Sequence, residues 1–189
     1  MILIFFGPPG AGKGTQASLV SKKIGIPHLS TGDILRNILK KENNISKKIR
    51  EIIDSGKLVS DDILNQIVSD RINDQDCKSG FILDGYPRTI EQAYFIDKLL
   101  KTKNMKISSI IDIDVNEETI IKRIKSRSEI EKRIDDSENI IKTRILKYLT
   151  ETKPLSDHYK ILYPGLYSRV DGTQNIDEIS SNIDEIIRK

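Results

Sequence analysis

The sequence predicts an α/β fold built on a parallel β-sheet that is wrapped by helices. Short apolar runs rich in Ile, Val and Phe alternate with longer segments of helical periodicity, and this alternation is typical of strands connected by helices. At 189 residues the chain has the size of one ordinary domain. It contains no internal repeat, low-complexity tract or Pro/Ser-rich linker. We therefore expect a single domain with small insertions.

Five apolar segments are predicted to form the strands. The first is apolar throughout and ends in a turn rich in glycine and proline, which is typical of a buried strand. The strands are expected near Ile2–Phe6, Pro27–Leu29, Gly80–Asp84, Ser109–Val115 and Leu166–Val170.

Eight segments of helical periodicity are predicted to form the helices. Glycine follows two of them where a C-terminal cap is expected, at Gly25 and Gly56. Side chains that favour the N-cap position precede four of them, at Ser60, Thr89, Asn116 and Ser137. Pro154 is expected to kink its helix. The segments are Lys13–Ile24, Gly32–Lys40, Ser46–Asp54, Asp61–Asn73, Ile90–Lys101, Glu117–Arg127, Glu138–Tyr163 and Ile176–Arg188.

The composition excludes several classes of partner and site. Lys and Arg number 31 against 28 for Asp and Glu, and the net charge of +3 is too weak to indicate a nucleic-acid or membrane partner. No stretch approaches the roughly 20 apolar residues that cross a bilayer, and the N-terminal apolar run lacks the basic leader of a signal peptide. The single cysteine, Cys77, excludes an internal disulfide and suits a reducing compartment. We therefore expect a cytoplasmic protein.

A glycine-rich motif directly follows the first strand. GPPGAGKGT, residues 7–15, has the spacing G-x-x-x-x-G-K and ends this pattern at Lys13. Its glycines let successive backbone N–H groups point at one anion, and the following helix adds the positive end of its dipole. Lys13 then supplies a charge between the β- and γ-phosphates of a nucleotide. The motif predicts a nucleoside triphosphate site, although Gly14 stands where Ser or Thr usually ligates magnesium, and Thr15 comes one residue later.

Two other interpretations explain this motif less completely. A plain strand–helix turn accounts for the glycines but has no need of Lys13. A dinucleotide site would use Gly10 and Gly12 as its first glycines and Asp33 for a ribose hydroxyl. That pattern requires a third glycine where Thr15 stands.

The run SGFILDGYPRT places further candidates just beyond a buried strand. Asp84 ends this strand, where α/β sheets hold ligands and where a carboxylate organises magnesium through water. A turn cap beside Gly85 is the alternative role for Asp84. Arg88 follows Pro87, and its guanidinium either forks onto a phosphate or forms a surface ion pair.

Several polar residues admit both a structural and a binding role. Thr89 and Gln92 have the T-x-x-Q spacing of a capping box, so Gln92 is either a cap or a reader of a base. Thr31 lies in the run STGD, which can simply begin a helix. Arg123 and Arg127 are four residues apart on one predicted helix, so both face either a nucleotide cleft or solvent.

Six motifs, in order, make the chain resemble the adenylate kinases over essentially its whole length. They are GPPGAGKGT, STGDILR, GKLVSDD, LDGYPRTIEQA, RSEIEKRIDD and VDGT. The resemblance implies a P-loop NTPase-like, three-layer α/β/α fold with a five-stranded parallel sheet. It also implies a core at 1–29, 60–127 and 138–189, an excursion that binds a nucleoside monophosphate at 30–59, and a short lid at 128–137.

The resemblance further implies which residues bind each substrate. The catalytic residues would be Lys13, Asp84, Arg88, Arg133 and Arg144. The ATP-binding residues would be Gly10, Ala11, Gly12, Lys13, Gly14, Thr15, Arg123, Arg127 and Gln174. The AMP-binding residues would be Thr31, Arg36, Lys57, Leu58, Val59, Gly85, Tyr86, Pro87, Arg88, Gln92, Arg133 and Arg144. Asp135 and Asp136 would support the closed lid. The sequence departs from the family pattern at Ser128 and Lys132, which stand where glycine is common.

The implied reaction is ATP + AMP ⇌ 2 ADP with Mg²⁺, which would be held through water near Asp84 and by no direct protein ligand. The phosphate of AMP, with a second pKa of about 6, is already ionised at neutral pH, so positioning and charge neutralisation replace a general base. His28 and His158 are expected at a strand edge and a helix surface. The implied partners are ATP, AMP and ADP; we expect a monomer without zinc, because one cysteine cannot form a Cys₄ site.

Two other function classes stand as alternatives. A UMP/CMP kinase shares this fold and its phosphate machinery, but Thr31 and Gln92 favour AMP. A non-catalytic P-loop switch is the second alternative, and a guanine switch would be expected to contain an N-K-x-D motif, which the sequence lacks.

Overall fold

The fold is centred on a sheet of five parallel strands in the order β2-β3-β1-β4-β5. The computed structural model describes residues 1–40, 46–47, 49–50, 59–131 and 138–188, with the backbone alone at 127–131 and 138–140. The strands are β1 (Ile2–Phe6), β2 (His28–Ser30), β3 (Phe81–Asp84), β4 (Ser109–Asp114) and β5 (Tyr167–Asp171). The predicted α/β fold is confirmed, and each strand begins and ends within one residue of its predicted bounds.

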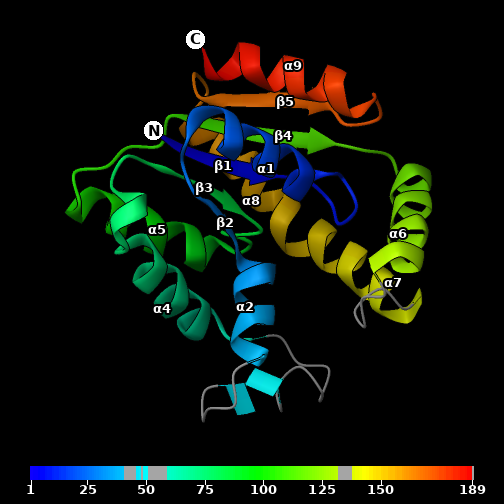
Figure 1. Cartoon of the computed structure of the whole chain (residues 1–189), viewed down its shortest axis with the longest axis horizontal. Coiled ribbons are helices and arrows are strands. Elements are labelled where there is room, and N and C mark those ends of the chain that lie inside the picture. Colours follow the sequence, from blue (N-terminus) through cyan, green and yellow to red (C-terminus); the bar gives the residue numbers. More distant parts are fainter. Residues whose placement is uncertain (41–45, 48, 51–58, 132–137, 189) are drawn as a thin grey trace.

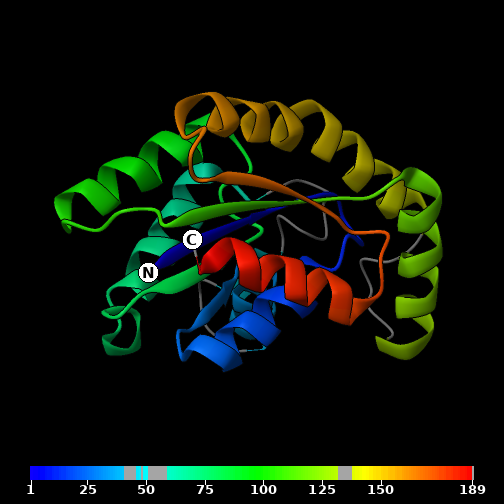
Figure 2. The same cartoon turned by 90° about the horizontal axis from the view of Figure 1, so that it is seen from above.

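Helices cover both faces of the sheet and make three layers (Figures 1 and 2). One face is packed by α1 (Lys13–Ile24) and α9 (Ile176–Ile187). The opposite face is packed by α4 (Asp61–Ile72), α5 (Ile90–Thr102) and α8 (Lys153–Leu162). Each face therefore has its own apolar cluster, and the sheet separates the two.

The central strand β1 contributes to both apolar clusters by alternation. Ile2, Ile4 and Phe6 pack toward α4, α5 and α8, whereas Leu3 and Phe5 pack toward α1 and α9. All five side chains are buried. A strand covered on both faces is a continuous apolar run, which is why this run predicted a buried strand.

The carboxyl ends of β1 and β3 meet in the middle of the sheet. Phe5 of β1 lies opposite Asp84 of β3, and Phe6 lies opposite Asp112 of β4. The chain first builds the β2 side of the sheet and then crosses to the β4 side, so the strand order changes direction at β1. Open α/β sheets bind ligands beyond the carboxyl ends of the strands at such a point. The glycine-rich loop and Asp84 therefore share one crevice.

Most of the predicted helix caps that fall on described residues form as expected. Gly25 ends α1 with a φ of 72°, and the Thr89 hydroxyl accepts the Gln92 N–H at 3.2 Å. The Asn116 side chain accepts an N–H from the helix that follows it. Ser60 precedes α4 in an extended conformation, but its side chain makes no capping hydrogen bond. Two further predicted caps lie outside the described residues: Gly56 and Ser137.

Helix α6 is longer than predicted. It spans Glu117–Glu131, whereas the sequence predicted an end at Arg127 and a lid from Ser128. The run from Ser128 to Glu131 contains neither glycine nor proline, so nothing in it stops the helix. The first four residues of the predicted lid thus continue α6, and the rest of it, 132–137, lies outside the described residues, as do parts of the predicted 46–54 helix.

The long helix predicted over Glu138–Tyr163 is divided in three. It consists of α7 (Glu138–Lys147), a π-helical turn at Tyr148–Thr152 and α8. Pro154 has no N–H to donate, and its ring crowds the carbonyl one turn earlier, so the backbone widens just before it. The sequence predicted a kink at Pro154, and the structure shows a π turn in the residues that precede the proline.

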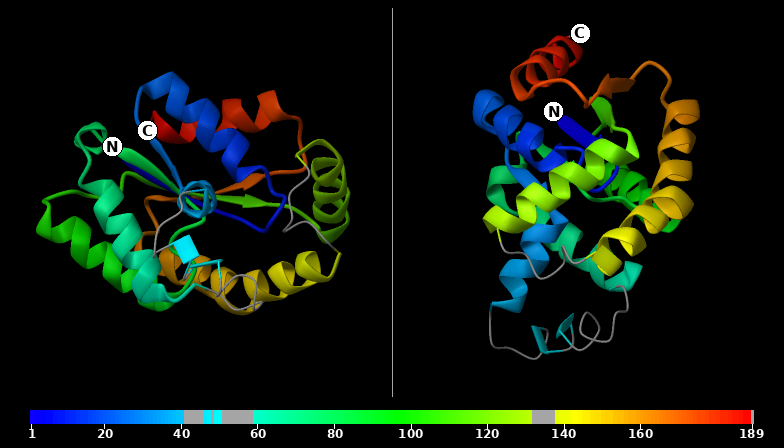
Figure 3. Two further views of the ribbon diagram at one scale, coloured as in Figure 1. Left: turned by 60° about the horizontal axis from the view of Figure 1, so that its bottom comes forward. Right: turned by 90° about the vertical axis from the view of Figure 1, so that its right-hand side faces the viewer.

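Helix α2 (Thr31–Leu39) starts directly at the end of β2 and leaves the sheet on the side away from α9 (Figures 1 and 3). Ser30 is its N-cap, and the Ser30 hydroxyl accepts the Asp33 N–H at 3.3 Å. A short 3₁₀ turn at Gln75–Cys77, which the sequence did not predict, joins α4 to β3. In the part of the chain described here, no helix is long and apolar enough to cross a membrane.

A buried carboxylate ties β4 to α8 and β5. Asp112 is 8% exposed, and its Oδ2 accepts hydrogen bonds from the Tyr167 hydroxyl at 2.6 Å and the Ser156 hydroxyl at 2.9 Å. Burial is the main cause that raises the pKa of Tyr167, so the phenol remains a donor. These two bonds supply partners for one oxygen of a buried carboxylate, whose burial would otherwise be costly, while its Oδ1 has no hydrogen-bond partner among the described residues.

We predict that Tyr167→Phe lowers the free energy of unfolding by about 1–3 kcal/mol, because a hydrogen bond to a buried carboxylate is lost. The matched control is Tyr163→Phe, which removes a longer hydrogen bond of 3.4 Å to Asp97. Urea denaturation of both variants measures the difference. Equal losses in the two variants would contradict the stabilising role of the Tyr167–Asp112 bond.

Candidate nucleotide-binding site

The glycine-rich loop between β1 and α1 depends on glycine at two close approaches. Gly7 has a φ of +138°, and a Cβ there would lie 2.5 Å from the carbonyl oxygen of Ile113. Gly10 has a φ of +82°, and a Cβ there would lie 2.9 Å from Ile124 on α6. Only glycine adopts these conformations in this space without strain. The loop can therefore curl against β4 and α6 and present its N–H groups to the crevice.

Lys13, the first residue of α1, folds back over the loop. Its Nζ donates hydrogen bonds to the carbonyl oxygens of Gly7 and Pro8, both at 2.8 Å. The ammonium is thus held above the loop, at the point where an anion cradled by the loop would meet it. An ammonium has three donors, so one is left for such an anion.

The charge on Lys13 is sensitive to its surroundings. Burial is the main cause that lowers the pKa of its ammonium to about 8. Asp84 opposes this shift, whereas the guanidinium groups of Arg88 and Arg144 add to it, and Asp112 opposes it again. The site therefore gathers several positive groups around one lysine, which favours a highly charged anion.

Asp84 occupies the predicted place at the end of β3. It is 8% exposed, and its Oδ2 lies 3.1 Å from the Nε2 of His28 on the edge strand β2. A Cβ added at Gly14 would lie 3.4 Å from the same oxygen, so the carboxylate faces the start of α1. The sequence placed His28 at a strand edge, which is confirmed, but did not predict its contact with Asp84.

These groups line one cleft of about 810 Å³. Four arginines reach it from four different segments: Arg36 of α2, Arg88 after β3, Arg123 of α6 and Arg144 of α7. The cleft also includes residues 9–16 of the glycine-rich loop, Asp84 and Gly85. A cleft with this lining can neutralise two polyanionic groups at once.

The arginines are held by nearby carbonyl and carboxylate groups. Arg36 Nη2 lies 2.7 Å from Asp33 Oδ1, and Arg88 Nε donates to the Gly85 carbonyl at 2.8 Å. Arg123 Nη1 donates to the Ala11 carbonyl at 3.4 Å. Arg123 therefore faces the cleft, which decides between the two roles that its helix position left open.

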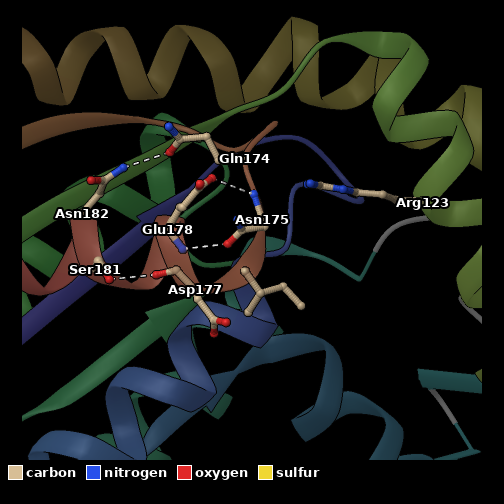
Figure 4. Close-up of a pocket in the computed structure, with 8 residues that line it drawn as sticks. Arg123, Gln174, Asn175, Asp177, Glu178, Ser181 and Asn182 are labelled. Carbon is tan, nitrogen blue, oxygen red and sulfur yellow. Dashed lines mark hydrogen bonds between the residues drawn. The ribbon is translucent and has the colours of Figure 1, made fainter.

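A second pocket, of about 800 Å³, adjoins the first at Arg123. Figure 4 shows the Arg123 side chain pointing from α6 toward the loop at Gln174 and Asn175, where α9 begins. Asn175 and Glu178 form a capping box that the sequence did not predict, and Asn182 donates to Gln174 Oε1 at 2.9 Å. The capping box and this bond hold the pocket wall in place, so a planar ring could enter beside Arg123.

The loop from Gly85 to Gln92 reaches the cleft with Gly85 and Arg88, whereas Tyr86, Pro87 and Gln92 are buried. The Thr31 hydroxyl donates to the Gly85 carbonyl at 2.9 Å. The Gln92 side chain is 2% exposed; its Oε1 accepts the Arg88 N–H at 2.7 Å, and its Nε2 donates to Asp61 Oδ1 at 2.7 Å. Thr89 caps α5 as expected, but the amide of Gln92 turns to Arg88 and Asp61, so only half of the capping box forms.

The structure brings together most of the candidates that it describes. On the cleft lie Gly10, Ala11, Gly12, Lys13, Gly14, Thr15, Arg36, Asp84, Gly85, Arg88, Arg123 and Arg144. Gln174 lines the adjoining pocket, whereas four candidates are buried behind the cleft or next to it: Thr31, Tyr86, Pro87 and Gln92. Val59 is also buried. The described side chains do not include Lys57, Leu58, Arg127, Arg133, Asp135 or Asp136.

Comparison with known proteins gives one consistent result. The family model described as adenylate kinase matches residues 5–162. The chain is 42% identical to the adenylate kinase of Rhizobium meliloti (strain 1021), over 99% of this chain and 100% of that protein. It is 40% identical to the adenylate kinase of Thermotoga neapolitana, over 98% and 96% of the two chains. It is 42% identical to the adenylate kinase of Bartonella henselae, over the whole of both chains.

These matches cover both the glycine-rich loop and the cleft arginines, and they extend over nearly the full length of the relatives. They also agree with the resemblance that the six motifs indicated. The chain therefore belongs to the adenylate kinase family, whose members are enzymes that transfer phosphoryl groups between adenine nucleotides.

Proposed function

We propose that this protein catalyses the reversible transfer of the terminal phosphoryl group of ATP to AMP, giving two ADP, by in-line displacement with Mg²⁺. The single observation that supports this most is the cleft, in which Lys13 and Asp84 lie with four arginines from four segments. One nucleotide needs far fewer positive groups than this. Two phosphate chains that meet end to end account for a larger set of cations.

In the proposed reaction, an oxygen of the AMP phosphate attacks the γ-phosphorus of ATP, and the bond to the β–γ bridging oxygen breaks. ADP leaves with that oxygen, and the acceptor becomes the second ADP. The glycine-rich loop and Lys13 bind the donor phosphates, and Arg88 and Arg36 bind the acceptor phosphate. Arg144 binds the phosphoryl group during its transfer, together with Arg133, which lies outside the described residues. These cations lower the repulsion between the two anions.

The residues near Asp84 fit a magnesium ion. Carboxylate and water oxygens are the ligands that Mg²⁺ prefers, and the Asp84 carboxylate faces Gly14 at the start of α1. Gly14 has no hydroxyl to offer the metal, so Asp84 would hold the ion through water. When bound, Mg²⁺ neutralises charge on the β- and γ-phosphates.

The acceptor site is assigned to AMP because of the polar groups near Gly85. The Gln92 amide has two N–H groups and two lone pairs, and one of each is engaged with Asp61 and Arg88. One donor and one acceptor are left for an adenine edge. The Thr31 hydroxyl lies beside the same loop.

The remaining parts of the proposal concern the surroundings of the enzyme. ATP, AMP and ADP are its substrates, and we propose a monomer in the cytoplasm that needs neither zinc, nucleic acid nor a membrane. The lone thiol, Cys77, is buried, and burial raises its pKa to about 11, so it is an unreactive group that suits a reducing compartment.

Lys13→Ala is expected to lower kcat by a factor on the order of 10² to 10³, because the ammonium stabilises charge that develops on the transferred group. The melting temperature should change far less than kcat, since the Lys13 ammonium gives the loop two hydrogen bonds but carries a buried charge that is costly in the folded protein. A coupled assay and thermal denaturation measure the two effects. Lys22→Ala, on the same helix and exposed, is the control; a Lys13 variant as active as this control would contradict the proposal.

ATP binding is expected to weaken as pH rises above about 8, because Lys13 has a pKa of about 8 in the free protein. The phosphates of bound ATP raise that pKa, so binding takes up a proton above this pH. The dissociation constant should then increase by up to about tenfold per pH unit. Calorimetry with ATP over this pH range measures it, and Lys13→Met should show a flatter profile. Identical profiles would contradict the assignment.

AMP is expected to be the preferred acceptor over CMP, UMP and GMP. Pyrimidines would leave the pocket partly filled and the Gln92 amide poorly paired, which costs several kcal/mol at most. A coupled assay compares kcat/KM for the four monophosphates in the native protein and in Gln92→Ala. Equal use of CMP or UMP would favour a pyrimidine kinase; unchanged selectivity in Gln92→Ala would leave AMP transfer standing without Gln92 as its reader.

A further inference from the structure

Asp61, the first residue of α4, accepts hydrogen bonds from Thr89 and Gln92, which lie at the two ends of the turn that begins α5. Its Oδ2 accepts the Thr89 hydroxyl at 2.6 Å, and its Oδ1 accepts Gln92 Nε2 at 2.7 Å. Asp61 itself is partly buried. Each oxygen of one carboxylate therefore has its own partner, and both bonds are of the short, charge-assisted kind.

The contact with Asp61 fixes which way the Gln92 amide points. A carboxylate only accepts hydrogen bonds, so the NH₂ group of Gln92 must face Asp61 and the amide oxygen must face the other way. That oxygen accepts the Arg88 N–H at 2.7 Å. Asp61, Gln92 and the backbone of Arg88 thus form one chain of hydrogen bonds that ends at a cleft arginine.

Thr89 gives Asp61 a second route to the same loop. Its hydroxyl accepts the Gln92 N–H while it donates to Asp61, so the carboxylate fixes the direction of the hydroxyl proton as well. One turn later on α4, Asn65 accepts the Tyr86 hydroxyl at 2.6 Å. Asp61 and Asn65 are four residues apart and face the same side. The first two turns of α4 therefore hold the loop from both ends.

We propose that Asp61 is a positioning residue for the acceptor nucleotide, acting through Gln92 and Thr89 on the loop that contains Gly85 and Arg88. This inference rests on the proposed function and deepens it. Asp61 does not line the cleft. Its bond to Nε2 fixes the amide plane, and with it the direction of the second N–H and the second lone pair. Its link to Arg88 fixes the backbone that bears the acceptor-binding guanidinium.

Asp62 separates this role from a general helix effect. Both Asp61 and Asp62 are acidic residues in the first turn of α4, so both favour the positive end of the helix dipole. Asp62 is exposed and has no part in the chain from Asp61 to Arg88. Asp62→Ala is therefore a matched control for Asp61→Ala.

The test measures KM for AMP at saturating ATP, KM for ATP at saturating AMP, and AMP binding by calorimetry without ATP. Asp61→Ala should raise KM and the dissociation constant for AMP about tenfold or more, the size expected for a lost hydrogen bond to a charged group. KM for ATP should stay at its native value. Asp61→Asn should recover most of the loss, because its carboxamide oxygen still accepts Gln92 Nε2. Asp62→Ala should behave as the native protein.

A double variant tests the route through Gln92. Because Asp61 acts through both Gln92 and Thr89, Asp61→Ala combined with Gln92→Ala should weaken AMP binding by clearly less than the sum of the two single losses, whereas independent effects would add. Additive losses, equal increases in both KM values, or a lowered melting temperature with AMP binding unchanged would overturn the inference. If the native protein transfers phosphate to AMP, and Asp61→Ala has the same KM and dissociation constant for AMP as Asp62→Ala, the role of Asp61 is overturned and the proposed function stands. Native protein that binds AMP without transferring phosphate to it would overturn the proposed function alone.

Discussion

The balance of charge around Lys13 is the constraint on which the rest of the site depends. The ammonium is drawn over the loop by two carbonyl oxygens, and burial with nearby arginines weakens its hold on a proton. Asp84 supplies part of the opposing charge. Because Asp84 ends β3 and the loop follows β1, this balance requires the two strands to be neighbours, and the parallel register of Phe5 and Asp84 provides that arrangement.

The same constraint explains why the surrounding helices are placed as they are. Helix α6 approaches the loop so closely at Gly10 that no side chain fits there, and this contact brings Arg123 to the cleft. Helix α2 starts directly after Ser30, the last residue of β2, which pairs with Asp84 on the neighbouring strand, and it brings Arg36 to the cleft. The arginines are distant in sequence, and they come together because the segments that contain them meet beyond the carboxyl ends of the strands.

Sequence reasoning was most successful where a residue type had one physical use. The glycines and Lys13 together specify a phosphate loop, and an apolar run buried on both faces specifies a central strand. It was less successful where a side chain had a choice of partners. Gln92 had the spacing of a capping box, yet its amide bonds Arg88 and Asp61, which come from separate segments. The contact of His28 with Asp84 likewise depends on the order of strands, and no local pattern reveals it. The extension of α6 could be anticipated from the missing glycine at Ser128.

The π turn before Pro154 has a consequence for the phase of the helix on either side of it. In an unbroken α-helix, Arg144 and Leu155 would be separated by about three turns and would point almost the same way. The π turn adds about one residue to the count and rotates the earlier segment by about 100° relative to the later one. Leu155 is thereby buried against the sheet while Arg144 faces the cleft, and Ile141 packs in the apolar cluster of the opposite face. The inserted residue thus sets the rotation of α7 relative to α8. Deleting one residue within the π turn would turn Arg144 out of the cleft, although no amino acid that lines the cleft would be changed.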